Sequence, residues 1–352
     1  ADHLFLEEVP TETFDDIGGL DEQAQRLREL VQLHLDHPKK VGKYNVRRDC
    51  GALLEGPPGT GKTMLVKGLV SYLRERSPSG KARFIFIRPG ELSSMWFSKT
   101  EQRIRQVFKL AREAAAADPS TPVVIFFDEI DWIASSRSGH IHGVEKRAVV
   151  TLGSEMDGLV GRGNIMVIGA TNRKHDLSAA LIRAGRLGDE PITVGRPNRA
   201  AARSILSKYF VEDIPYATDG SSQAEARDNI IESAVSRLYS PNGEGEVATV
   251  VYRDGERRTI RIHEIMSGAM LAHIAQKSLR GACLREIETE EEGVTLSDVF
   301  TAIEAEIENA ASLLTPANSK RYVAGLRQDV DVVSVEKIER KTAQIHHYLR
   351  VA

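Results

Sequence analysis

An eight-residue segment with three glycines, Gly56–Thr63, constrains the fold more than any other part of this 352-residue sequence. It reads Gly-Pro-Pro-Gly-Thr-Gly-Lys-Thr, follows the β-type run Ala52–Leu54 and opens an apolar helical pattern. A glycine-rich turn between a strand and a helix can point consecutive backbone N–H groups, together with the positive end of the helix dipole, at an anion. The segment therefore predicts a phosphate-binding loop in an α/β fold.

Further short β-rich runs alternate with amphipathic stretches through the first half of the chain. The strand candidates are Ala52–Leu54, Phe84–Ile87, Val123–Phe127, Ile165–Gly169 and Ile192–Val194. This alternation is typical of helices that cover a parallel sheet. We therefore predict a nucleotide-binding α/β core over residues 1–195, with a parallel five-stranded sheet flanked by helices.

After Pro197 the pattern becomes mainly helical, with apolar residues at helical spacing over residues 230–238 and 296–307. Two β-branched runs within residues 246–262 flank Asp254-Gly255, which is a strong hairpin signal. We expect a helical lid subdomain over residues 196–315 with a β-hairpin insertion at 246–262. A C-terminal tail with strand-like stretches follows over residues 316–352.

Two adjacent carboxylates, Asp128 and Glu129, end the apolar run Val123–Phe127. Ligand sites in parallel sheets lie at the carboxyl ends of the strands. We expect Lys62 to contact the β- and γ-phosphates, and the Thr63 hydroxyl and Asp128 to bind Mg²⁺. Glu129 is then the general base that accepts a proton from the attacking water.

Asn172 follows the apolar run Ile165–Gly169 and is placed to orient that water, although an Asx turn at a strand end is an alternative interpretation. The strand Phe84–Ile87 lies between the loop and the catalytic carboxylate in sequence, which favours hydrolysis over phosphoryl transfer to a metabolite. The chain has no guanine-selecting Asn-Lys-x-Asp motif, so we expect ATP as the nucleotide.

The composition excludes several other classes of protein. Lys and Arg total 47 against 50 for Asp and Glu, a near-balance that argues against nucleic-acid binding. No apolar run approaches the ~20 residues of a membrane span, and the two cysteines show no metal-type spacing, so we expect a cytoplasmic protein. Because the chain starts at Ala1 without an initiator Met, we expect it to be part of a longer protein.

In their order and spacing, five motifs resemble those of the classical AAA ATPases. They are Phe14–Leu20, Gly56–Thr63, Asp128–Asp131, Gly169–Asn172 and Arg183–Arg186. The resemblance implies a P-loop AAA+ module that works as a ring, in which Arg183 and Arg186 reach the γ-phosphate held by a neighbouring subunit. It also implies signalling between subunits through Asp157 and Gly158. Its implied nucleotide-binding residues are Asp16, Gly18, Pro58, Gly59, Thr60, Gly61, Lys62, Thr63, Met64, Asp128, Gly268 and Ala269.

Met95–Ser98 falls at the position of the first pore loop of that family. Trp96 and Phe97 would grip an extended polypeptide, since aromatic rings pack against side chains of any kind. Core packing of the two aromatic rings is the alternative.

Within the AAA family, the chain is similar to the actinobacterial proteasomal ATPases, the Mpa/ARC group. The segments that carry this likeness are Arg237–Tyr239, the hairpin, Ser267–Met270 and the hydrophobic tail after Pro316. The resemblance implies a homohexameric protein unfoldase that threads polypeptide through a central pore, with Pup-tagged proteins and a 20S proteasome as partners. Tyr348 is not the penultimate residue, which favours a remodelling ATPase without a protease as the alternative. A nucleic-acid motor is a third hypothesis, which the charge balance and the aromatic pore loop disfavour.

Overall fold

The computed structural model describes residues 6–7, 10–44, 51–88, 98–134, 142–159, 164–173, 176–182, 186–188, 190–241, 244–323 and 325–338. The chain divides into two compact units, Ala1–Pro197 and Asn198–Ala352, which are described one at a time. The domain boundaries predicted at residues 195 and 315 remain predictions. None of the helices in the described ranges has the length and apolar character that a membrane crossing requires.

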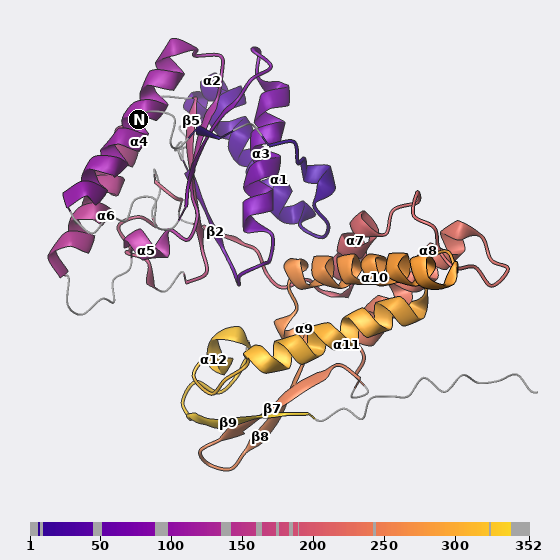
Figure 1. Ribbon diagram of the computed structural model, residues 1–352. Coiled ribbons are helices and arrows are strands. Elements are labelled where there is room, and N and C mark those ends of the chain that lie inside the picture. Colours follow the sequence, from indigo (N-terminus) through magenta and orange to yellow (C-terminus); the bar gives the residue numbers. More distant parts are fainter. Residues whose placement is uncertain are drawn as a thin grey trace, which may run out of the picture. The chain divides into compact units, whose positions relative to one another are not determined.

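The first unit is a sheet with helices on both faces (Figure 1). Its strands are β1 (Leu6–Glu7), β2 (Gly51–Glu55), β3 (Arg83–Ile87), β4 (Val123–Phe127), β5 (Ile165–Thr171) and β6 (Ile192–Thr193). Its helices are η1 (Phe14–Asp16), α1 (Asp21–Val31), η2 (Gln32–Asp36), α2 (Pro38–Lys43), α3 (Lys62–Arg76), α4 (Ser98–Ala117), α5 (Asp131–Ala134) and α6 (His142–Asp157).

The strand order is β1-β3-β4-β5-β2-β6, and β2 to β6 are mutually parallel. The five parallel strands predicted from the sequence are therefore confirmed. The sequence prediction missed β1, a two-residue strand antiparallel to β3 at one edge, because two residues are too short to show a period.

Alternate residues of each parallel strand face opposite layers of helices, as the two-residue period of a strand requires. In β4, Ile125 packs with α4, α5 and α6, whereas Phe126 packs with α1 and α3. Both faces of β4 and β5 are buried, which explains why these strands are continuous, mainly apolar runs.

The second unit is mainly helical, with a small sheet at one end. Its helices are α7 (Arg199–Tyr209), α8 (Gln223–Leu238), α9 (Ile262–Ile265), α10 (Gly268–Thr289), α11 (Leu296–Leu313) and α12 (Ser319–Tyr322). Its strands are β7 (Glu246–Tyr252), β8 (Arg257–Arg261) and β9 (Val332–Lys337). One apolar core joins α7, α8, α10 and α11 to the sheet.

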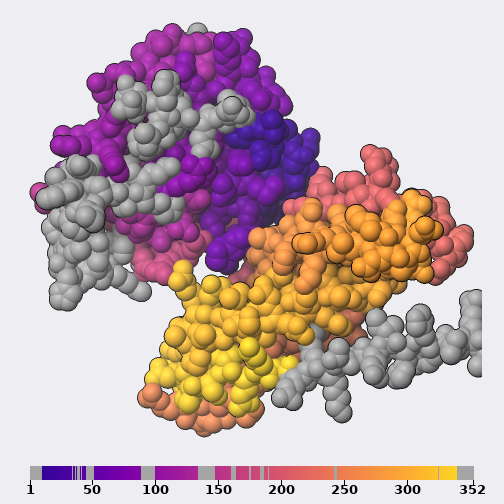
Figure 2. All heavy atoms as spheres, viewed as in Figure 1, coloured from indigo at the N-terminus to yellow at the C-terminus, as the bar shows by residue number. Residues whose placement is uncertain are grey.

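The predicted hairpin is present as β7 and β8, and its turn contains Gly255 at φ +85°. A third strand comes from the tail, because β9 pairs antiparallel with the other edge of β7. Figure 2 shows the described part of the tail, in yellow, beside the hairpin at one end of this unit. Strand β9 of the tail is thus part of the same sheet as the insertion.

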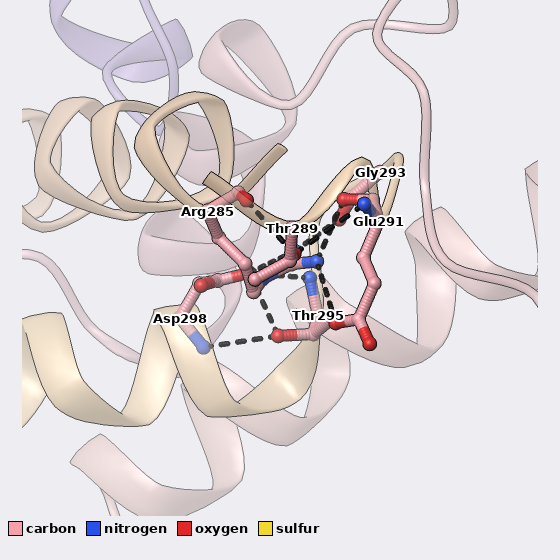
Figure 3. A network of polar contacts seen from close by, with 6 residues as sticks. All are labelled: Arg285, Thr289, Glu291, Gly293, Thr295 and Asp298. Atoms are coloured by element: carbon pink, nitrogen blue, oxygen red, sulfur yellow. Dashed lines mark hydrogen bonds and ion pairs between the residues drawn. The ribbon is translucent and has the colours of Figure 1, made fainter. Parts of the chain in front are cut away.

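Arg285 of α10 closes the loop between the two longest helices of this unit (Figure 3). Its guanidinium donates to the carbonyl oxygens of Glu291 and Gly293 and to Asp298 Oδ2, the last at 2.9 Å. Asp298 Oδ2 also accepts from Thr295, which caps α11. One arginine thereby satisfies loop carbonyls and joins the end of α10 to the start of α11.

Candidate active site

Strand register brings the predicted site residues to one edge of the sheet. β5 lies between β2 and β4, with Thr171 opposite Glu55 of β2 and Gly169 opposite Phe127 of β4. The glycine loop, Asn172 and the carboxylates therefore follow three adjacent strands at their carboxyl ends. This is where an open parallel sheet places a ligand site.

The glycine loop has a backbone that only glycine adopts without strain at three positions. Gly56, Gly59 and Gly61 have φ values of +156°, +74° and +101°. At Gly56, a Cβ would lie 2.0 Å from the carbonyl oxygen of Val194, so the loop is also closely packed there. Gly61 then precedes α3, whose first residue is Lys62.

The ammonium group of Lys62 is buried at the centre of the loop, with the residue 7% exposed. It donates to the carbonyl oxygens of Gly56, at 2.9 Å, and Pro57, at 2.7 Å, and to Asn172 Oδ1 at 2.8 Å. Burial lowers the pKa of Lys62 to about 8, and the carboxylates of Asp128, Glu129 and Asp131 oppose that shift.

The turn after β4 presents the two predicted carboxylates. Backbone bonds fix the turn to both neighbouring strands, since Asp128 N–H donates to the Ile87 carbonyl and Ile130 N–H to the Ala170 carbonyl. Thr63 Oγ1 lies 3.4 Å from Asp128 Oδ2. Two hard oxygen ligands side by side suit Mg²⁺, which takes few protein ligands and keeps several waters.

Glu129 is exposed and has φ +46°, a left-handed conformation that is uncommon for a residue with a side chain. Its backbone N–H donates to Asp128 Oδ1 at 3.0 Å, which supports the turn. Backbone strain of this kind concentrates at functional sites.

The carboxyl end of β5 is anchored by a hydrogen bond to Asp131, which lies in the acidic segment after β4. Thr171, fully buried, donates through its hydroxyl to Asp131 Oδ1 at 2.8 Å and accepts from the backbone N–H of Arg173 at 2.9 Å. These bonds orient the strand end that carries Asn172. Sequence reasoning missed this role of Asp131, although its place in the acidic segment after β4 was the available signal.

The comparison with known families agrees with this geometry. The profile of the "ATPase family associated with various cellular activities (AAA)" matches residues 52–193, and that of the "ARC, AAA+ ATPase lid domain" matches residues 197–350. The chain belongs to the AAA ATPase family. The resemblance inferred from the motifs is thereby confirmed, and family membership implies nucleotide binding.

Curated relatives of this AAA chain carry two kinds of name. A Corynebacterium kroppenstedtii protein named "AAA ATPase forming ring-shaped complexes" is 35% identical over 97% of this chain and 61% of its own length. A Thermomonospora curvata protein named "Proteasome-associated ATPase" is 36% identical over 86% of this chain and 53% of its own length. The chain therefore spans about three fifths or less of the length of these relatives.

Arg186, predicted to serve a neighbouring AAA subunit, is buried within its own chain. Its guanidinium makes a two-pronged bond to Asp157, from Nε to Oδ1 at 2.9 Å and from Nη2 to Oδ2 at 2.8 Å. A Cβ on Gly153 would lie 2.2 Å from Nη1 of Arg186. The pairing of Arg186 with Asp157 could not be deduced from the sequence, because the two residues are 29 positions apart.

The backbone of Arg186 lies at the far end of β2 from the glycine loop. Its carbonyl oxygen would be 2.8 Å from a Cβ on Gly51, the first residue of that strand. A five-residue strand is about 13 Å long from first to last Cα. Arg186 is therefore poorly placed for the phosphates of its own AAA site, and its role as a trans finger stays a prediction.

The segment predicted to lie beside the adenine packs on α3. The ring of Phe14 lies 2.9 Å from a Cβ built on Gly68, and the side chain of Leu20 lies 3.1 Å from a Cβ built on Gly61. Asp16 is exposed, and its carboxylate accepts from both the backbone and the hydroxyl of Thr13. The segment thus passes beside the loop, while contact of Asp16 and the buried Gly18 with a nucleotide stays a prediction.

The other predicted site residues fall into three groups. Pro58, Gly59 and Met64 are exposed on the loop and α3, whereas Thr60 is buried and donates to the Pro57 carbonyl. In the second unit, Gly268 and Ala269 begin α10 after Ser267, whose hydroxyl accepts from Met270 N–H. Arg183, Trp96 and Phe97 lie outside the described residues.

Proposed function

We propose that this chain is the ATP-hydrolysing module of a cytoplasmic, hexameric protein unfoldase that threads polypeptide through a central pore. The observation that carries the proposal is the convergence of Lys62, Thr63, Asp128, Glu129 and Asn172 at the carboxyl ends of three adjacent strands. Each residue type there has a role in phosphoryl chemistry.

The roles follow from the contacts. Lys62 donates to the β- and γ-phosphates of ATP, and the loop N–H groups surround them. Thr63 and Asp128 would hold Mg²⁺, which would neutralise charge on the phosphates when bound. Glu129, exposed at the strained turn, takes the proton from the attacking water, and Asn172 orients that water.

The partner proposals rest on the relatives' names and on the resemblance. Relatives named as ring-forming support a homo-oligomer, and those named as proteasome-associated support delivery to a 20S proteasome. Pup-tagged substrates and the grip of Trp96 and Phe97 are part of the same proposal. Remodelling without a protease is the second candidate, because other relatives are named only as ring-forming AAA ATPases.

Replacing the proposed base tests the enzymatic part. Glu129→Gln should bind ATP as tightly as the wild type and lose hydrolysis by about two to four orders of magnitude. Glu113→Gln, on the exposed surface of α4, is the matched control and should hydrolyse ATP normally. Undiminished turnover by Glu129→Gln would remove Glu129 as the base.

Translocation needs a separate test. With a tagged, folded reporter, Trp96→Ala should keep basal ATP hydrolysis and lose unfolding, measured as loss of reporter fluorescence. Adding a 20S core then separates the two candidates, since degradation supports the proteasomal function and unfolding without degradation supports remodelling. Unchanged unfolding by Trp96→Ala would contradict the pore-loop assignment.

A further inference from the structure

The amide oxygen of Asn172 accepts a hydrogen bond from the ammonium group of Lys62, which is also the group proposed to bind the nucleotide phosphates. Lys62 has three N–H donors. Three protein oxygens accept from it, namely the carbonyl oxygens of Gly56 and Pro57 and Oδ1 of Asn172. Lys62 can therefore donate to a phosphate oxygen only when it releases or shares one of these acceptors.

The two carbonyl oxygens are the fixed acceptors of this set. Gly56 is held to β5 by its N–H, which donates to the Thr171 carbonyl at 3.2 Å. It is also held against Val194, whose carbonyl oxygen would lie 2.0 Å from an added Cβ. Movement of Gly56 or Pro57 would disturb the glycine loop itself, the element that is to surround the phosphates.

The third acceptor is a half-buried side chain at the end of β5, which can turn about its own side-chain torsions. Its backbone need not move, because Thr171 is anchored to Asp131 at 2.8 Å. Asn172 is thus the acceptor that Lys62 exchanges most readily.

We propose that Asn172 competes with the phosphates for Lys62, so that this contact lowers nucleotide affinity and nucleotide binding frees the Asn172 amide for its role beside the water. This inference rests on the proposed function, because it concerns the same phosphate site. Asn172 acts here as a positioning residue through Lys62. The competition weakens apparent affinity because only the fraction of molecules with a free Lys62 donor is ready to bind.

The test compares two substitutions with effects of opposite sign. Asn172→Ala removes the competing oxygen and should bind ADP about tenfold more tightly than the wild type, the equivalent of one hydrogen bond to a charged group. Asn172→Asp places a carboxylate on Lys62 and should bind ADP more weakly. A variant that merely damaged the fold would weaken binding in both cases.

Calorimetric titration of the full chain with ADP in EDTA gives these affinities without a contribution from Mg²⁺ at Thr63 and Asp128. Asn164→Ala is the matched control, because Asn164 precedes the opposite end of β5, where its amide donates to the carbonyls of Ala115 and Thr121. Its affinity for ADP should equal that of the wild type. AMP, which lacks the phosphates assigned to Lys62, should bind equally to wild type and Asn172→Ala.

Equal or weaker ADP binding by Asn172→Ala would overturn the inference, and so would an equal gain in affinity for AMP. Failure of the proposed function gives a different result, because the wild type and Asn164→Ala would then bind no ADP. Tighter ADP binding by Asn172→Ala together with slower ATP hydrolysis would support both roles of this residue.

Discussion

The acidity of Lys62 predicts a specific pH dependence of nucleotide affinity. Burial lowers the pKa of this ammonium from 10.5 to about 8, so the chain holds the cation below pH 8 and loses it progressively above. Phosphate binding favours the protonated form, since the charged ammonium donates to the phosphate oxygens. Affinity should therefore be nearly constant from pH 6.5 to about 7.5 and fall above pH 8.

The size of the effect follows from the fraction of Lys62 that stays protonated. One pH unit above the pKa, about nine tenths of the side chains are neutral, which weakens binding about tenfold at pH 9. The assay is the dissociation constant of ADP in EDTA, measured from pH 6.5 to 9.5. Lys62→Arg is the comparator, because a guanidinium stays charged throughout this range.

The contribution of Lys62 to folding stability should change with pH in the opposite direction to the ADP affinity. Between pH 8 and 10.5 the unfolded state holds more protons on Lys62 than the folded state, so this residue's contribution to stability rises with pH. Weaker ADP binding at pH 9 therefore cannot be explained by a loss of folding stability that arises from the titration of Lys62. An ADP affinity that stays constant to pH 9.5 in the wild type would refute the assignment of Lys62 as the buried phosphate ligand.

Three substitutions test the packing that supports the site and the second unit. Gly56→Ala should destabilise the first unit by about 3 kcal/mol, seen as a lower thermal midpoint, because its Cβ would collide with the carbonyl oxygen of Val194. Gly42→Ala, with open space around its Cβ, should leave the midpoint unchanged. Gly153→Ala should displace the guanidinium of Arg186 and lower the free energy of unfolding by about 2 kcal/mol. In an Arg186→Ala background the same substitution should cost much less. Equal costs in the two backgrounds would contradict the contact. Arg285→Ala should lower the free energy of unfolding of the second unit by about 2 kcal/mol, measured as a lower thermal midpoint. An unchanged midpoint would show that the hydrogen bonds of Arg285 to the loop contribute little to stability.

The sequence predicted those features that a local pattern records. Each buried parallel strand is an apolar run, and the glycine loop has a fixed spacing, so both were predicted at nearly their observed positions. The hairpin was predictable for the same reason, because Asp254-Gly255 is a local turn signal. Patterns of this kind depend on neighbours in sequence rather than in space.

Contacts between distant segments left no such pattern. The strand β9 pairs with β7 about 85 residues earlier, and nothing in its sequence specifies that partner. Lys62 and Asn172 were both predicted as site residues, but each was assigned to the nucleotide or the water rather than to the other. Identifying their contact required the register of β2 against β5, which a single sequence does not contain.

The contacts of Arg186 bear on the two arginines predicted as trans fingers. A buried guanidinium with a two-pronged carboxylate partner is costly to remove from its place, because both hydrogen bonds to Asp157 and the packing on Gly153 would be lost. Asp157 is 56% exposed at the end of α6, so the pair sits at the surface of the unit while its cation is enclosed. This arrangement suits an arginine that shapes the segment around it, and it makes Arg183 the stronger candidate for direct contact with a neighbour's γ-phosphate. Mixing Arg183→Ala chains into wild-type rings should then lower the rate of ATP hydrolysis without lowering thermal stability, whereas Arg186→Ala should lower both.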